Sequence, residues 1–282
     1  MAVSVQVPAS TTNLGPGFDC LGISLRIWNR ISIEVDRSQD PVPEMVSQTA
    51  DLFFNHTGET PFPIRCSIEG DIPQARGLGS SVTIRLGVLI ALDRLTNRRL
   101  SREEICSLCA ELEGHPDNAA AALFGGFTII TTANRVARFD IDQALKFVLF
   151  IPDFEVKTSE ARTVVPNSFP RKAVVENLAN ASLIAAAFAS GKYAYLRDSF
   201  VDNLHQPFRE QFVPFLPRVL RAAVAAGAFG GFLSGSGSTI ACLTLSDGKE
   251  VAAAIEAAAP EQNAKIVIVS ADNDGARVVL EE

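Results

Sequence analysis

The chain has 282 residues, of which 47% are apolar and 20% are charged. This length suits two ordinary domains with filled cores, so disorder, collagen and small disulfide scaffolds are excluded. The 25 basic and 32 acidic residues give a net charge of −7. This balance argues against a broad surface for nucleic acid or an anionic membrane, because both surfaces need clustered Lys and Arg. If the chain binds phosphate, it must do so at one small site and not with a broad basic surface.

The compartment is indicated by the N-terminus and by the cysteines. The first residues carry neither the basic region nor the apolar region of a signal peptide. No apolar run reaches the ~18 residues of a membrane span. The five cysteines are an odd number in a long chain, which is typical of reduced thiols. We therefore expect a cytoplasmic protein with no membrane and no nucleic-acid partner.

The first half of the chain alternates between strand and helix signals. Residues 2–7 alternate between apolar and polar and predict a strand that ends at Pro8. The other expected elements are strands over 21–27, 31–35 and 64–68, and helices over 44–56, 82–95, the segment from the capping box Ser101–Glu104 to Glu113, and 119–124. Strands over 127–132, 135–140 and 146–151 then predict a meander.

Pro152 marks the predicted boundary between domains at 1–150 and 151–282. Beyond it we expect helices over 158–164, 171–190, 214–226 and 248–258, and strands over 229–234, 239–245, 265–270 and 276–280. This order of elements predicts an α+β fold in which helices cover antiparallel sheets.

Cys106 and Cys109 form a Cys-x-x-Cys pair, a spacing that metal and redox sites also use. Both lie in the expected helix that ends at Glu113, on the same face as Ile105 and Leu112. No second Cys-x-x-Cys pair completes a tetrahedral metal site. The pattern favours structural cysteines that face the core.

The segment Gly77-Leu-Gly-Ser-Ser81 lies directly before an expected helix. Backbone N–H groups and the positive helix end meet at such a place and can hold an anion, while the serines add hydroxyls. The segment is not a Walker loop, and Val82 stands where a Rossmann fingerprint needs glycine. An ordinary turn with a serine cap is the alternative. A second Gly/Ser loop over 233–239 and the stretch 13–19 favour a phosphate site.

Three motifs follow one another along nearly the whole chain: Pro8–Asp19, Pro73–Ser81 and Leu233–Ser238. In these motifs the chain resembles the GHMP small-molecule kinases. Four further segments resemble the homoserine kinases within that superfamily. They are Asn13–Asp19, Glu113–Asn118 with Phe124–Gly126, Ser159–Arg162, and His205–Arg209.

The resemblance implies a fold, a reaction and two cofactors. The fold would be α+β with two domains, an N-terminal domain like ribosomal protein S5 domain 2 and a ferredoxin-like C-terminal domain. The reaction would be ATP- and Mg²⁺-dependent phosphorylation of the L-homoserine hydroxyl to O-phospho-L-homoserine in threonine biosynthesis. Whether the chain forms a homodimer stays an open question.

The resemblance also implies an amino-acid pocket. Asp19 would take the substrate ammonium, and Arg209 would bind its carboxylate as a planar fork. Arg162 would lie near the hydroxyl and the incoming phosphoryl group. The pocket would be completed by Asn13, His115 and Asn118. Asn118, Arg162 and Asp117 are the implied catalytic residues, and for Asp117 a structural or orienting role stays open beside that of a base.

The nucleotide would be bound by Pro73, Arg76, Gly77, Leu78, Gly79, Ser80, Ser81, Thr158 and Gly235. Glu113 is the expected magnesium ligand, supported by the hydroxyls of Ser80 and Ser81, and Glu111 is the competing candidate.

Two departures from the family pattern concern the nucleotide side. The helix after the Gly loop begins with the bulky and partly charged segment Val82–Arg85, where the family has small residues. Glu44-Met-Val46 stands near where the family often has an Asn-Leu-Val that helps to hold adenine. These departures leave two alternatives open: a non-catalytic amino-acid sensor on the same fold, and a sister GHMP kinase with another small hydroxyl acceptor.

Overall fold

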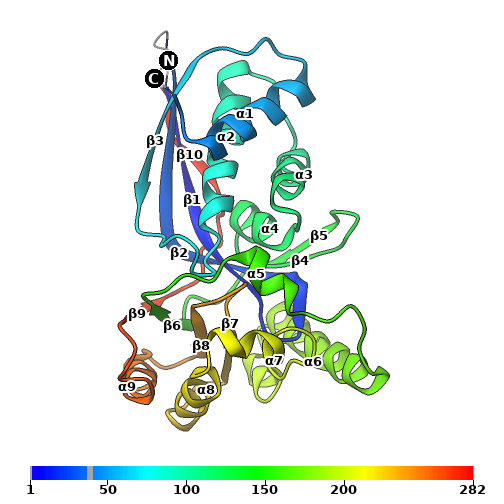
Figure 1. Ribbon diagram of the computed structural model, residues 1–282, viewed down its shortest axis with the longest axis vertical. Helices are drawn as coiled ribbons and strands as arrows, with labels where there is room; N and C mark the ends of the chain where they lie inside the picture. The colour runs from blue at the N-terminus through cyan, green and yellow to red at the C-terminus, as the bar shows by residue number, and fades with distance from the viewer. Residues whose placement is uncertain (1, 37–40, 282) are drawn as a thin grey trace.

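The computed structural model describes residues 2–36 and 41–281 and contains two sheets with helices packed on them (Figure 1). The first sheet has six strands in the order β10-β1-β2-β4-β5, with β3 also paired to β2. Its strands are β1 (Ala2–Asn13), β2 (Gly17–Val35), β3 (Ile64–Gly70), β4 (Phe127–Ile130), β5 (Val136–Phe139) and β10 (Arg277–Glu281). Neighbouring strands in this sheet are antiparallel.

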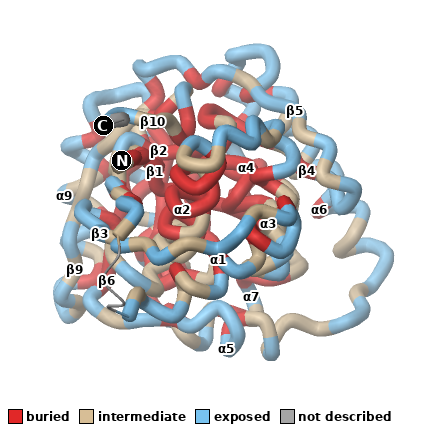
Figure 2. The backbone as a smooth tube through the Cα atoms, turned by 90° about the horizontal axis from the view of Figure 1, so that it is seen from above, coloured by how far each residue is buried: buried red, intermediate tan, exposed pale blue. Residues whose placement is uncertain are grey.

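Four helices cover one face of the first sheet. They are α1 (Glu44–Thr57), α2 (Ser80–Thr96), α3 (Arg102–Glu113) and α4 (Asp117–Phe124). Helix α2 is apolar on nearly every side and lies buried at the centre of the group (Figure 2). It packs directly on β2, where a Cβ on Gly87 would lie 2.5 Å from that of Ile31. The N-terminal end of α2 lies at the end of the first sheet that meets the second sheet (Figure 1).

The second sheet has four strands in the order β7-β8-β6-β9. They are β6 (Lys146–Pro152), β7 (Gly230–Leu233), β8 (Ile240–Thr244) and β9 (Ala264–Val269). The helical elements of this half are α5 (Thr158–Thr163), α6 (Arg171–Ser190), α7 (Gln206–Arg209), α8 (Leu216–Ala225), α9 (Lys249–Ala258), and the 3₁₀ turns η1 (Tyr193–Leu196) and η2 (Glu210–Phe212). Apolar residues of α8 and α9 share one core with β6 and β8. A second core joins the other face of this sheet to α6 and to β2 and β4.

The α+β prediction is confirmed, and most of the expected helices and strands are present with small shifts at their ends. Three details were wrong. The strand predicted to end at Pro8 continues to Asn13, because its later residues stay paired with β2 beyond an irregularity after Pro8. The strands predicted over 21–27 and 31–35 are one strand, because a register shift after Pro8 lets β1 and β2 bend and stay paired. The predicted meander breaks at its third strand, because β6 pairs with β8 and β9 in the second sheet.

Sheet membership does not follow the predicted domain boundary at residue 150 strictly. Strand β6 begins at Lys146 and belongs to the second sheet, whereas β10 returns from the C-terminal part to pair with β1 in the first. The division into 1–150 and 151–282 stays a prediction.

Helix α6 has the length that we expected, but it departs from the expectation that no apolar run is as long as a membrane span. By length and composition it is, within residues 2–36 and 41–281, the one helix that could cross a membrane. Its buried Asn177 donates to the carbonyl of Pro16 and accepts from the backbone N–H of Asn203. These contacts tie α6 to the loop between β1 and β2 and to the segment that precedes α7.

The cysteine pair of α3 is structural. Ser101 and Glu104 form the predicted capping box, and Cys106 and Cys109 are buried free thiols. Burial raises the pKa of Cys106 to about 12, so its thiol stays protonated and inert.

Candidate active site

Three segments that are far apart in the sequence meet where the two sheets adjoin. They are the end of β1, the Gly loop before α2, and the loop between β7 and β8. The hydroxyl of Ser234 donates to the carbonyl of Gly77 at 2.6 Å and shares a hydrogen bond of 2.7 Å with Thr11. The backbone N–H of Gly235 donates to the carbonyl of Thr12 at 3.2 Å. The three sequence motifs therefore form one structural unit.

Two glycines of the loop allow this close packing. Gly77 has φ +72°, and a Cβ there would lie 2.0 Å from the carbonyl oxygen of Ser234. Gly79 has φ +69°, and a Cβ there would lie 2.2 Å from the hydroxyl oxygen of Ser10. Because a side chain fits neither position, the sequence pattern of this loop follows from its contacts.

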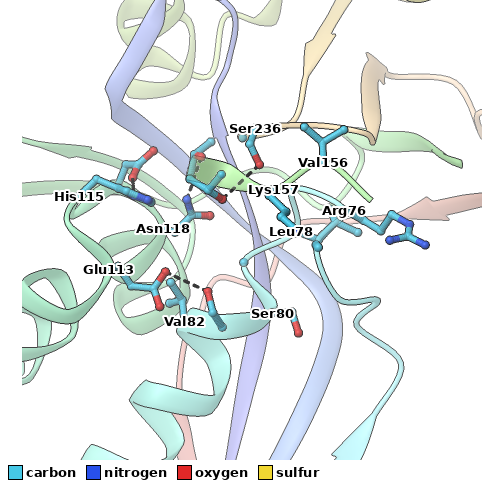
Figure 3. Close-up of a pocket in the computed structure, with 18 of the residues that line it drawn as sticks. Arg76, Leu78, Ser80, Val82, Glu113, His115, Asn118, Val156, Lys157 and Ser236 are labelled. Atoms are coloured by element: carbon cyan, nitrogen blue, oxygen red, sulfur yellow. Dashed lines mark hydrogen bonds and ion pairs between the residues drawn. The ribbon is translucent and has the colours of Figure 1, made fainter. Parts of the chain in front are cut away.

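The N-terminal end of α2 has the groups that an anion-binding site needs. Gly79 caps the helix in the left-handed conformation without a side-chain hydrogen bond to the first turn. The first N–H groups of an α-helix have no partner within the helix, and they carry its partial positive charge. The hydroxyls of Ser80 and Ser81 stand beside them. This end of α2 opens into a cavity of about 490 Å³ (Figure 3).

Nearly all of the predicted site residues line this one cavity. They are Asn13, Asp19, Arg76, Gly77, Leu78, Gly79, Ser80, Ser81, Glu113, His115, Asp117, Asn118, Thr158, Arg162, Arg209 and Gly235. Pro73 lies elsewhere, in a second hollow on the far side of Arg76. The competing metal candidate Glu111 is exposed to solvent, whereas Glu113 faces the cavity.

One end of the cavity holds a pair of opposite charges. The guanidinium of Arg162 binds the carboxylate of Asp19 with two hydrogen bonds, of 2.7 and 3.0 Å. Asn13 fixes the backbone beside it, because its side chain accepts from the N–H of Asp19 and donates to the carbonyl of Gly235. About one third of each charged side chain is exposed, so this ion pair borders the open part of the cavity.

Arg209 is a buried cation at the same end, with only 2% of its surface exposed. Its Nε donates to the carbonyl of Ala161 at 3.1 Å and its Nη1 to that of Gly235 at 3.0 Å. Phe18 lies within 6 Å of the guanidinium carbons of both Arg209 and Arg162. Burial, and then the charge of Arg162, lower the pKa of Arg209 to about 10. Two cations beside one carboxylate leave this end ready for an anionic group.

His205 holds Arg209 in place and is itself fully buried. Its Nε2 lies 2.8 Å from the carbonyl oxygen of Gly15, so this nitrogen carries the proton. Its Nδ1 then accepts from Nη1 of Arg209 at 3.2 Å. Burial and the charge of Arg209 lower the pKa of His205 to about 4, which keeps the ring neutral.

Asp117 lines the same cavity and accepts hydrogen bonds from three neighbours. His115 Nδ1 lies 2.9 Å from its carboxylate, and both the hydroxyl of Thr12 and the N–H of Asn118 donate to it. Burial alone would raise the pKa of Asp117, but these contacts outweigh it and lower the pKa. Burial opposes the charge on His115, yet the bond to Asp117 raises its pKa. The carboxylate is therefore a fixed, hydrogen-bonded group.

Asn118 joins the first motif to the helix that carries Asp117. Its Nδ2 donates to the hydroxyl of Thr12 at 3.1 Å, and its Oδ1 accepts from Ser10 at 2.8 Å. With both ends of the amide engaged, Asn118 fixes the position of α4 relative to β1.

A magnesium ion would fit between the Gly loop and the end of α3. The hydroxyl of Ser81 donates to Oε2 of Glu113 at 2.9 Å, so a hydroxyl oxygen and a carboxylate oxygen converge beside the N-terminal end of α2 (Figure 3). These are the hard oxygen ligands that Mg²⁺ takes together with phosphate oxygens and water. The described residues contain no group of three or more His, Cys, Asp or Glu able to hold a metal alone.

Both segments that depart from the family pattern contribute residues to the same cavity. Met45, Val82 and Ile84 line it and provide an apolar wall. Thr158 on α5 lies next to the loop between β7 and β8, with a hydroxyl contact of 3.4 Å to Ser236.

Several residues that shape the site were not singled out in the sequence. Thr12, Phe18 and Ser234 lie inside the quoted motifs, so their position was a usable signal. Lys157 also lines the cavity, next to the predicted Thr158. His205 belongs to a quoted segment, but its contact with Arg209 depends on the fold.

The comparisons with known proteins agree with this geometry. Residues 44–126 match the family described as GHMP kinases N terminal domain, and residues 182–262 match the one described as GHMP kinases C terminal. The homoserine kinase of Caldicellulosiruptor saccharolyticus is 35% identical, over 98% of this chain and 96% of that protein. The homoserine kinase of Trichormus variabilis is 36% identical, over 95% of each chain.

Solved structures show the same fold. The structure of homoserine kinase from Cytophaga hutchinsonii is similar with a TM-score of 0.89, at 22% identity over 99% of this chain and 97% of that one. The mevalonate kinase of Methanococcus jannaschii is similar with a TM-score of 0.70, at 15% identity over 96% of this chain and 98% of that one. The chain therefore belongs to the GHMP kinases and, within them, to the homoserine kinase family.

Proposed function

We propose that the chain transfers the γ-phosphoryl group of ATP to the side-chain hydroxyl of L-homoserine and so forms O-phospho-L-homoserine. The observation that carries this proposal is the single cavity with an anion-binding helix end on one side and the Asp19, Arg162 and Arg209 cluster on the other. The relatives of the family that bear the name homoserine kinase support it.

The nucleotide would enter with its phosphates at the N-terminal end of α2. Backbone N–H groups, together with the Ser80 and Ser81 hydroxyls, would hold the phosphate oxygens. The apolar wall of Met45, Val82 and Ile84 would accept the flat adenine base. Arg76 is anchored to the carbonyl of Pro152 at 2.9 Å and would stiffen the loop rather than reach the phosphates.

Homoserine presents an ammonium, a carboxylate and a primary hydroxyl, and each has a complementary group in the cavity. The ammonium would share the carboxylate of Asp19. The substrate carboxylate would bind Nη2 of the buried cation Arg209 rather than a planar fork, because Nε and Nη1 already donate to protein acceptors. As the ammonium takes part of Asp19, Arg162 gains freedom to turn toward the hydroxyl and the phosphoryl group. Binding of the amino acid would thereby couple to placement of the catalytic cation.

The transfer itself would depend on positioning and on charge stabilisation. As the hydroxyl oxygen bonds to the γ-phosphorus, the bond from that phosphorus to the bridging oxygen would break, so that ADP leaves with this oxygen, and the hydroxyl proton would pass to a phosphoryl oxygen and from there to water. Arg162 would balance the negative charge on the phosphoryl oxygens. Asp117 is already engaged by three donors, so we assign it an orienting role through His115 and Thr12. A loose transition state is compatible with a site that lacks a strong base.

Ser81 and Glu113, with Ser80 beside them, would hold magnesium at the phosphates. Magnesium, when bound, neutralises charge on the β- and γ-phosphate oxygens.

Titration calorimetry with substrate analogues tests the acceptor assignment. We expect L-homoserine to bind in the presence of a non-hydrolysable ATP analogue and Mg²⁺, whereas 4-hydroxybutyrate, which lacks the ammonium, and 3-aminopropanol, which lacks the carboxylate, bind far more weakly. Arg209→Leu should weaken homoserine binding much more than nucleotide binding. Amino-acid binding without nucleotide binding would favour a sensor instead, and equal losses for both ligands in Arg209→Leu would contradict the assignment.

A further inference from the structure

Glu113 is clamped by two donors that come from a single helix. The hydroxyl of Ser81 donates to Oε2 at 2.9 Å, and Nε of Arg85 donates to Oε1 at 2.7 Å. Ser81 and Arg85 are four residues apart on α2, so both project from the same face of the helix. The two oxygens of one carboxylate are therefore assigned to different partners, with Oε2 on the side of the Gly loop.

The pair between Arg85 and Glu113 is largely withdrawn from solvent. Each side chain is 11% exposed, and Nη1 of Arg85 is fully buried without a hydrogen-bond partner in the described structure. A buried guanidinium nitrogen without an acceptor carries a desolvation cost. The protein nevertheless keeps the cation beside this carboxylate, which indicates a function for its charge or for its contact.

The charge of Arg85 matters because the pair of Arg85 and Glu113 lies at the end of a helix. Glu113 is the last residue of α3, and the C-terminal end of a helix already carries partial negative charge. Without Arg85, Glu113 and this helix end would form a strongly negative spot beside the phosphate site. Such a spot attracts a dication on its own, before any nucleotide arrives.

We propose that Arg85 is a positioning residue of the magnesium site and that it also suppresses binding of free Mg²⁺. Its Nε contact keeps Oε1 occupied, so Oε2 alone is presented to the metal beside Ser81. Its charge offsets that of Glu113, so the metal binds with the phosphates of the nucleotide rather than ahead of them. This inference depends on the proposed role of Glu113 as the metal ligand.

Three substitutions at one position separate the contact from the charge. Arg85→Gln places an amide N–H on Cδ, where Arg has Nε, and removes the charge. Arg85→Met has a similar length but removes both the donor and the charge. Arg85→Lys keeps a charge but replaces Nε with a methylene group. The readouts are calorimetric titration of MgCl₂ into the nucleotide-free protein and the kcat of homoserine phosphorylation, with the Tm of each variant as the control for folding.

We expect free Mg²⁺ to bind Arg85→Gln and Arg85→Met at least about tenfold more tightly than the wild type. Arg85→Lys should keep weak metal binding. Arg85→Met and Arg85→Lys should lose more kcat than Arg85→Gln, because only Gln keeps an N–H donor at the position of Nε. If free Mg²⁺ binds all three variants no more tightly than the wild type, or if kcat falls equally in all three, the inference is wrong.

Glu113→Gln distinguishes a failure of this inference from a failure of the proposed metal site. If Glu113→Gln weakens the dependence of MgATP turnover on Mg²⁺ while the Arg85 variants behave like the wild type, only the role of Arg85 is refuted. If Glu113→Gln leaves that dependence unchanged, Glu113 is not the metal ligand and both proposals fail. The double variant Arg85→Met with Glu113→Gln should lose the tight metal binding of Arg85→Met alone.

Discussion

Gly77 is the point where the second and third motifs touch, so Gly77→Ala tests their junction. A Cβ at Gly77 would lie 2.0 Å from the carbonyl oxygen of Ser234, whereas ordinary contacts begin at 3.4 Å. The two loops must then separate by about 1.4 Å (3.4 − 2.0 Å). The left-handed conformation costs alanine about 1–2 kcal/mol. Overpacking against a backbone carbonyl adds about 1–3 kcal/mol.

A misplacement of about 1 Å in a site can lower turnover by about a hundredfold. We therefore expect Gly77→Ala to lower the free energy of unfolding by roughly 2–5 kcal/mol and kcat/KM for ATP by about a hundredfold. Gly58→Ala is the matched control, because Gly58 has φ +70° and a Cβ there would have no atom within 4 Å. Gly58→Ala should lower the free energy of unfolding only by the cost of the left-handed conformation, and kcat/KM for ATP should stay at its wild-type value.

Urea unfolding and steady-state kinetics in ATP measure both effects. If Gly77→Ala is as mild as Gly58→Ala in stability and in kcat/KM for ATP, then the contact between the two loops does not shape the nucleotide site.

Two further predictions concern the buried acid and histidine groups. Asp117→Asn should lower kcat less than about tenfold if Asp117 only orients the site, whereas loss of a general base costs about 10²–10⁴-fold; a kinetic measurement at saturating homoserine separates the two. The pKa of His205 is lowered to about 4 from its ordinary 6.5, so between these pH values the unfolded chain binds a proton that the folded chain does not. The contribution of neutral His205 to the free energy of unfolding should therefore be complete above pH 6.5 and should be lost as the pH is lowered toward 4. His205→Gln should make the free energy of unfolding depend less on pH in this range. If the slope in unfolding experiments is unchanged in this variant, His205 is not its source.

Much of the fold was predictable because local signals and long-range packing agree. The capping box at Ser101 and the glycine-bounded helices each carry their signal within a few residues. The pairing of β6 was not predictable in this way. Its apolar run suits either sheet, and only the later strands β8 and β9 determine which one it joins.

The site also has parts that local sequence signals predict and parts that only long-range contacts create. The Gly loop has a local signature, since the left-handed φ values of Gly77 and Gly79 require glycine. The pair of Asp19 and Arg162 joins residues 143 positions apart, so no local pattern predicts their contact. The contact of Arg85 with Glu113 was hidden for the same reason, and in the sequence Arg85 is only a charged residue in a bulky helix start.

The proposed reaction is the transfer of the γ-phosphoryl group from ATP to homoserine within this cavity. A competition experiment tests it most directly: the chain is incubated with ATP and Mg²⁺ and with equal concentrations of L-homoserine, mevalonate, galactose and shikimate, and the phosphorylated products are identified by mass spectrometry. We expect O-phosphohomoserine to dominate, and Arg209→Leu to abolish that preference. Phosphorylation of another acceptor ahead of homoserine, or no phosphoryl transfer while both ligands bind, would contradict the account.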